Sequence, residues 1–66
     1  MSGAGPALDE IVATVTRMEL RYGASIHFPA YQRLCAQFSA DLADPRDLAL
    51  AKSAALMLIK YLESGA

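Results

Sequence analysis

The chain has 66 residues and a formal net charge of -1, and 55% of its residues are hydrophobic. This composition excludes extensive disorder, and the even charge balance argues against a nucleic-acid binder. A chain this short buries too little surface to be comfortably stable alone, and its single cysteine, Cys35, provides neither an internal disulfide nor a thiolate metal site. We therefore expect a partner chain to complete the fold.

The sequence carries no signal for export or for insertion into a membrane. Residues 1–6 lack the basic and apolar regions of a secretory signal. The longest apolar run, Ala54 to Ile59, is far shorter than the roughly 20 residues that span a bilayer. We expect a cytoplasmic protein without a membrane span, and the short, alanine-rich chain with its initial methionine favours a bacterial origin.

The first predicted element is a helix over residues 6–22. Pro6 suits a first helical turn because its missing N–H has no partner there, and Asp9 and Glu10 complement the positive end of the helix dipole. Apolar residues recur at alternating steps of three and four, which forms one continuous stripe. Gly23 is expected to end this helix in a left-handed conformation.

A connector and a second, shorter helix follow. In residues 24–29, apolar Ile26 and Phe28 alternate with polar residues, which predicts a short extended segment across the core. Pro29 favours an extended Phe28 and opens an amphipathic helix. The apolar positions of this helix are Tyr31, Leu34, Cys35, Phe38 and Leu42.

The third predicted helix is the longest and runs from residue 45 to about residue 63. Asp44 is placed to cap it, Pro45 fits its first turn, and Asp47 lies three residues past the cap. Gly65 is expected to end it.

The apolar residues of this third helix cover more of its circumference than one core-facing stripe requires. One stripe, which we expect to face the core, comprises Leu48, Ala51, Ala55, Leu58 and Leu62. The adjoining stripe comprises Leu50, Ala54, Met57 and Tyr61. The side left for water comprises Lys52, Ser53, Lys60 and Glu63. A helix this widely apolar is usually buried from more than one direction.

These elements predict an all-α fold: a small three-helix domain over residues 6–64, with two shorter helices and a long C-terminal helix, completed by oligomerisation. Residues 1–5 and 65–66 are expected to be flexible ends. We expect the contact with a partner to use residues of the first and third helices. These interface residues are Leu8, Ile11, Val15, Met18, Tyr22, Leu50, Ala54, Met57 and Tyr61.

No residue pattern indicates an enzyme, a cofactor site or a metal site. His27 has no neighbouring nucleophile or second titrating group at a defined spacing, and Cys35 lies on an apolar face as a small hydrophobe. The acidic residues Asp41, Asp44 and Asp47 lack the glycine-containing loop of an EF-hand. We therefore expect no catalytic residue, no cofactor and no metal ligand.

The leading hypothesis is a protein–protein interaction module, namely a small accessory or regulatory protein that forms a homodimer or docks on a larger partner. One alternative is a small transcriptional regulator that contacts DNA through Arg17, Arg21 and Arg33. Another is a helical bundle with a ligand pocket. The residues expected to line that pocket are His27, Phe28, Tyr31 and Cys35.

Overall fold

The structure is a computed structural model, and it describes residues 7–65. It contains three helices, α1 (Leu8–Tyr22), α2 (Phe28–Asp41) and α3 (Pro45–Glu63), and residues 7–65 form no strand. The predicted all-α class and the long C-terminal helix are confirmed. The predicted flexible segment 1–5 lies outside the described residues.

The ends of α3 follow the local sequence. The backbone N–H of Arg46 donates to Oδ1 of Asp44 at 2.8 Å, and Pro45 occupies the first turn. This bond satisfies one of the N–H groups that a helix start leaves without an intrahelical partner. At the other end Gly65 adopts a φ of 78°, a left-handed conformation that favours glycine. The predicted start and end of this helix are therefore confirmed.

The connector between α1 and α2 differs from its prediction. It consists of turns and a bend rather than an extended segment, and Ile26 is 86% exposed instead of lying across the core. Phe28 is the first residue of α2, although the proline after it disfavours helical geometry there. Gly23 has φ -61° and ψ -24°, so it continues the right-handed geometry of α1 and is not a left-handed stop.

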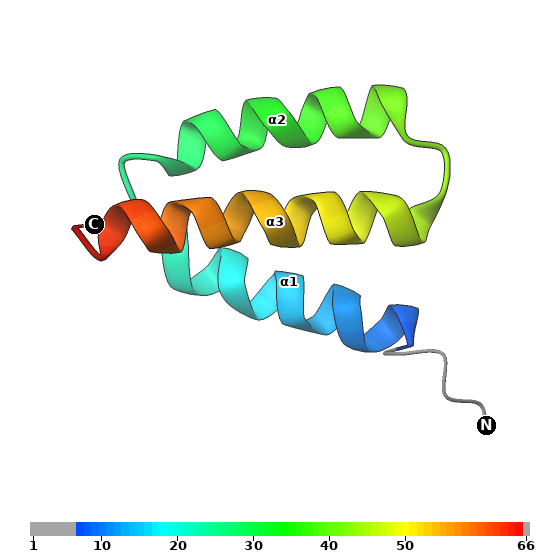
Figure 1. Cartoon of the computed structure of the whole chain (residues 1–66), viewed down its shortest axis with the longest axis horizontal. Coiled ribbons are helices and arrows are strands. Elements are labelled where there is room, and N and C mark those ends of the chain that lie inside the picture. Colours follow the sequence, from blue (N-terminus) through cyan, green and yellow to red (C-terminus); the bar gives the residue numbers. More distant parts are fainter. Residues whose placement is uncertain (1–6, 66) are drawn as a thin grey trace.

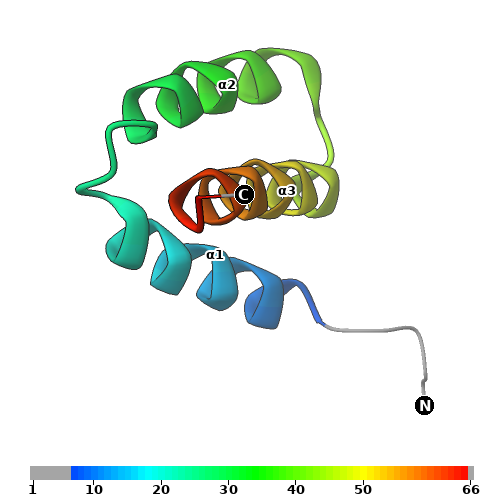
Figure 2. The ribbon, with the colours of Figure 1, turned by 60° about the vertical axis from the view of Figure 1, so that its left-hand side comes forward.

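Helix α3 lies between the other two helices (Figure 1). Both α1 and α2 pack along α3 but have few contacts with each other. The view turned by 60° shows the same arrangement, with α3 seen obliquely between its neighbours (Figure 2). The long helix is therefore the common support against which each shorter helix buries its apolar side.

The core comprises residues of all three helices, namely Ile11, Val15, Tyr31, Ala49, Ala55, Leu56 and Ile59. Around it pack Leu8, Met18, Tyr22, Phe28, Cys35 and Phe38. Leu56, with no exposed surface, has α1 and α2 on either side of its helix. The small side chains of Ala49 and Ala55 allow neighbouring helix axes to come close.

The face that α3 turns to the core was predicted incorrectly. Leu56 and Ile59 belong to neither predicted stripe, yet they are 0% and 3% exposed. Leu58 and Leu62 were expected in the core but are 54% and 42% exposed. Lys52, which was expected to face water, is half-buried against α1, as is Ser53. A helix that is apolar nearly all round does not reveal from its own sequence which face will be covered.

Leu56 provides the test of this core. Leu56→Ala removes a fully buried side chain and should lower the free energy of unfolding by about 2–5 kcal/mol. Leu20→Ala is the matched control, because Leu20 is 82% exposed and should change stability by less than about 0.5 kcal/mol. Urea unfolding followed by far-ultraviolet circular dichroism measures both, and equal losses would contradict this core.

Candidate interaction surface

An apolar strip runs along the side of α3 that no other helix covers. It consists of Leu50, Ala54, Met57 and Tyr61, and we call it the outer strip. Its members are separated by four, three and four residues, which places them on one side of a helix with 3.6 residues per turn. Ala54 is exposed, and the three larger side chains are 48%, 51% and 57% exposed in sequence order. The apolar surface therefore extends over most of the helix length.

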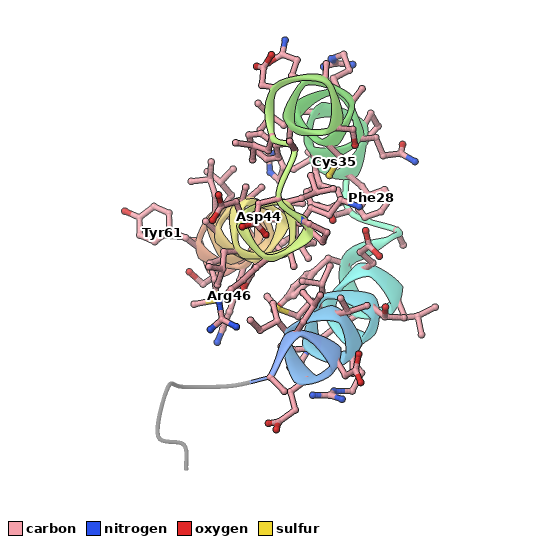
Figure 3. All side chains as sticks on the ribbon, turned by 90° about the vertical axis from the view of Figure 1, so that its right-hand side faces the viewer. Phe28, Cys35, Asp44, Arg46 and Tyr61 are labelled. Atoms are coloured by element: carbon pink, nitrogen blue, oxygen red, sulfur yellow. The ribbon has the colours of Figure 1, made fainter. Side chains whose placement is uncertain are left out.

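The outer strip faces away from α1 and α2. Figure 3 shows Tyr61 on one side of α3, pointing outward, whereas Phe28 and Cys35 lie on the side where the helices meet. The angle of about 100° per residue places buried Ile59 nearly opposite Tyr61 on the helix. The strip is consequently a second apolar face of α3 rather than the edge of the core.

The outer strip forms a ridge between two shallow grooves. On its α2 side, a groove of about 80 Å³ is bordered by Leu58, Leu62 and Leu34, which are themselves partly exposed. On its α1 side, a groove of about 250 Å³ is bordered by Glu10, Ile11, Thr14, Leu50 and Ser53. The surface around the strip is therefore apolar toward α2 and more polar toward α1.

Charged residues lie only at the margins of this surface. Asp47 is in the first turn of α3, one turn before Leu50, and Lys60 is in the last turn beside Tyr61. Residues 53–59 of α3, which pass through the middle of the strip, carry no charged side chain. An apolar centre with charges at its rim is the distribution that protein–protein contacts show.

The α1 residues expected at the interface lie in the intrachain core. Ile11 and Val15 are 7% and 5% exposed, and Leu8, Met18 and Tyr22 pack against the same core. These five side chains are therefore already covered within the chain. The four α3 residues predicted with them, by contrast, are all exposed.

A polar contact that the sequence did not suggest ties the α1–α2 connector to the end of α3. The hydroxyl of Ser25 donates to Oε2 of Glu63 at 2.9 Å, and Nε2 of His27 lies 3.9 Å from the same oxygen. Ser25 also accepts a bond from the backbone N–H of His27 at 3.1 Å. Glu63, which was expected to face only water, thus joins segments that are 38 residues apart. A serine in a connector and a glutamate at a helix end carry no sequence signal for such pairing.

A second polar contact joins α1 to α2. The hydroxyl of Tyr31 donates to Oε2 of Glu19 at 2.6 Å, and the tyrosine is 2% exposed. Burial, followed by hydrogen bonding with Cys35 and Glu19, raises the pKa of Tyr31 above its ordinary value. The tyrosine therefore stays neutral and keeps donating to the carboxylate.

The residues of the alternative ligand pocket are brought together only in part. His27 and Tyr31 border the small groove between α2 and α3, whereas Phe28 and Cys35 pack against the core. The centres of the Phe28 and Tyr31 rings lie 5.2 Å apart, so these two side chains pack against each other. Among residues 7–65, no three His, Cys, Asp or Glu side chains gather as a metal site would require.

The arginines of the alternative DNA-binding hypothesis do not share one surface. Arg17 and Arg21 are exposed on α1, where the first donates to Thr14 and the second lies 5.8 Å from the centre of the Tyr22 ring. Arg33 is exposed on α2, which lies across α3 from α1 (Figure 1). Phosphate binding favours basic residues clustered on one face, which this arrangement does not provide.

The class of protein does not follow from likeness to known proteins. No family model, no curated protein and no solved structure matches this chain. No helix within residues 7–65 is both long enough and apolar enough to cross a membrane. The outer strip is therefore interpreted from its own chemistry.

The Tyr31–Glu19 contact predicts a loss of stability in alkali. Because the pKa of Tyr31 is raised on folding, the unfolded chain releases this proton first, so stability falls as the pH rises above the ordinary tyrosine value of 10.0. Tyr31→Phe should remove this dependence while costing about 1 kcal/mol at neutral pH through the lost hydrogen bond.

Urea unfolding of wild type and Tyr31→Phe at about pH 8 and about pH 11 measures the difference. The control is Tyr22→Phe, which removes the hydroxyl of a tyrosine outside both the Tyr31–Glu19 contact and the outer strip, so it should show the same alkaline loss as the wild type. An identical alkaline loss in all three proteins would show that Tyr31 does not titrate in this way.

Proposed function

We propose that this chain is a helical protein–protein interaction module, a small accessory or regulatory subunit that contacts another protein chain through the outer strip. The observation that supports this proposal is the exposure of Leu50, Met57 and Tyr61 along one uncovered face of α3. Contiguous apolar surface of this kind commonly marks a binding site on a small protein. The lone cysteine is consistent with a reducing cytoplasm as the place of action.

The residue types on the strip suit a contact that carries binding energy. Methionine and aromatic residues are enriched in interfaces, and tyrosine is among the residues that dominate their energetics. Burying the exposed half of a large apolar side chain contributes about 1 kcal/mol. Met57 and Tyr61 lie one helical turn apart, so a single partner helix can cover both.

The small core supports the same proposal. Two of the seven core residues are alanines, Ala49 and Ala55, which contribute little buried area. A domain of this size often lacks sufficient stability until a partner covers its remaining apolar surface. Contact at the outer strip would place α3 within apolar surroundings on both of its faces.

Site-specific photocrosslinking tests the proposal in cells that produce the full chain. A photoreactive residue at Met57 should crosslink to another protein chain several-fold more strongly than one at Gln37, an exposed residue of α2. Ala54→Glu should abolish the Met57 crosslink, because an unpaired carboxylate at the contact costs about 3 kcal/mol or more, which is roughly 100-fold in affinity.

Ala13→Glu is the matched control, since it introduces the same group at an exposed alanine of α1. It should leave the Met57 crosslink and the helical circular dichroism signal unchanged. Equally weak crosslinking from Met57 and Gln37 would refute the outer strip as a contact surface.

A further inference from the structure

We propose that the partner of the outer strip is a second copy of this chain, bound across a two-fold axis near Ala54 with the two α3 helices antiparallel. This inference rests on the proposed function, because it names the occupant of the same surface. It adds the identity of the partner and the direction in which the helices pair.

The outer face of α3 is arranged evenly about Ala54. This residue lies at the middle of Pro45–Glu63, and Leu50 and Leu58 lie four residues before and after it. In an antiparallel pair, Leu50 of one copy lies at the height of Leu58 of the other, so that apolar groups face each other on both sides of the axis. The small side chain at the axis allows the helices to approach to about 8 Å.

The polar residues at the two ends of the outer face, Asp47 and Tyr61, favour the antiparallel direction. Asp47 and Tyr61 lie seven residues before and after Ala54. Antiparallel pairing brings each Asp47 to the height of the other copy's Tyr61, whose hydroxyl can donate to the carboxylate. Parallel pairing would instead place the two Asp47 carboxylates at the same height, where like charges repel, and would align the helix dipoles.

The arrangement about Ala54 also meets the requirement that a two-fold contact places on the residue at its axis. A two-fold contact joins the same surface patch on both copies, so the residue on the axis meets itself. A charged or large residue there would oppose pairing, whereas Ala54 is neutral, small and exposed. Leu58 and Leu62 extend the apolar surface toward α2, which gives each copy both a ridge and a groove for the other.

Disulfide trapping tests the direction of pairing, in full-length chains in which Cys35→Ala removes the natural thiol. Ala54→Cys should form a disulfide-linked dimer readily, because the two residues meet at the axis. Leu50→Cys should crosslink at least ten-fold more slowly, because the two copies of residue 50 would lie about 12 Å apart along the helices, beyond the reach of a disulfide. Ala13→Cys, at an exposed position of α1, is the control and should not crosslink.

Light scattering over a dilution series supplies the mass and separates the two proposals. A mass of twice 7.1 kDa with the expected crosslinking order supports the antiparallel dimer. Equal trapping of Leu50→Cys and Ala54→Cys would overturn the antiparallel direction, and a dimer without trapping at Ala54 would overturn the axis. A monomer at every concentration would overturn the second copy as partner. In that last case, a Met57 crosslink to a different protein would leave the proposed function standing, and its absence would remove both.

Discussion

The architecture depends on one packing contact, the burial of Leu56 and Ile59 on the face of α3 that α1 and α2 cover. Because only two short helices pack along α3, about half of its circumference can be covered within the chain. The other half carries the outer strip, so its exposure follows from the number of helices and not from a local irregularity. An apolar residue on that side contributes to stability only when another molecule covers it.

The polar contacts compensate for how little α1 and α2 touch each other. Tyr31 on α2 donates to Glu19 on α1, which joins the two helices directly. Because the tyrosine is almost fully buried, its hydroxyl would be costly to leave without an acceptor. This hydrogen bond therefore links directly two helices that otherwise pack mainly against α3.

Apolar periodicity predicted the three helices, but the local cap and proline signals held only for α3, where Asp44 and Pro45 set the start. At the end of α1 and the start of α2 they failed, because Gly23 stays right-handed and Phe28 is helical despite Pro29. The sequence predicted the buried face of α3 poorly, since Leu58 and Ile59 are equally apolar neighbours and only the positions of α1 and α2 decide which is covered. The outer strip was identified from its spacing, but its separation from the core is a tertiary property. The bond from Ser25 to Glu63 is tertiary as well, because it joins residues distant in sequence.

The contacts of Glu63 with Ser25 and His27 have a consequence for local unfolding at the C-terminal end of α3. The last turn of a helix normally frays, since its carbonyl groups lack intrahelical partners. Here Glu63, in that turn of α3, is held by the α1–α2 connector. We therefore expect the amide hydrogens of this turn to exchange with solvent only when the connector detaches. Hydrogen exchange in Ser25→Ala would reveal this coupling as faster exchange at residues 60–63, and unchanged exchange there would show that the turn opens independently.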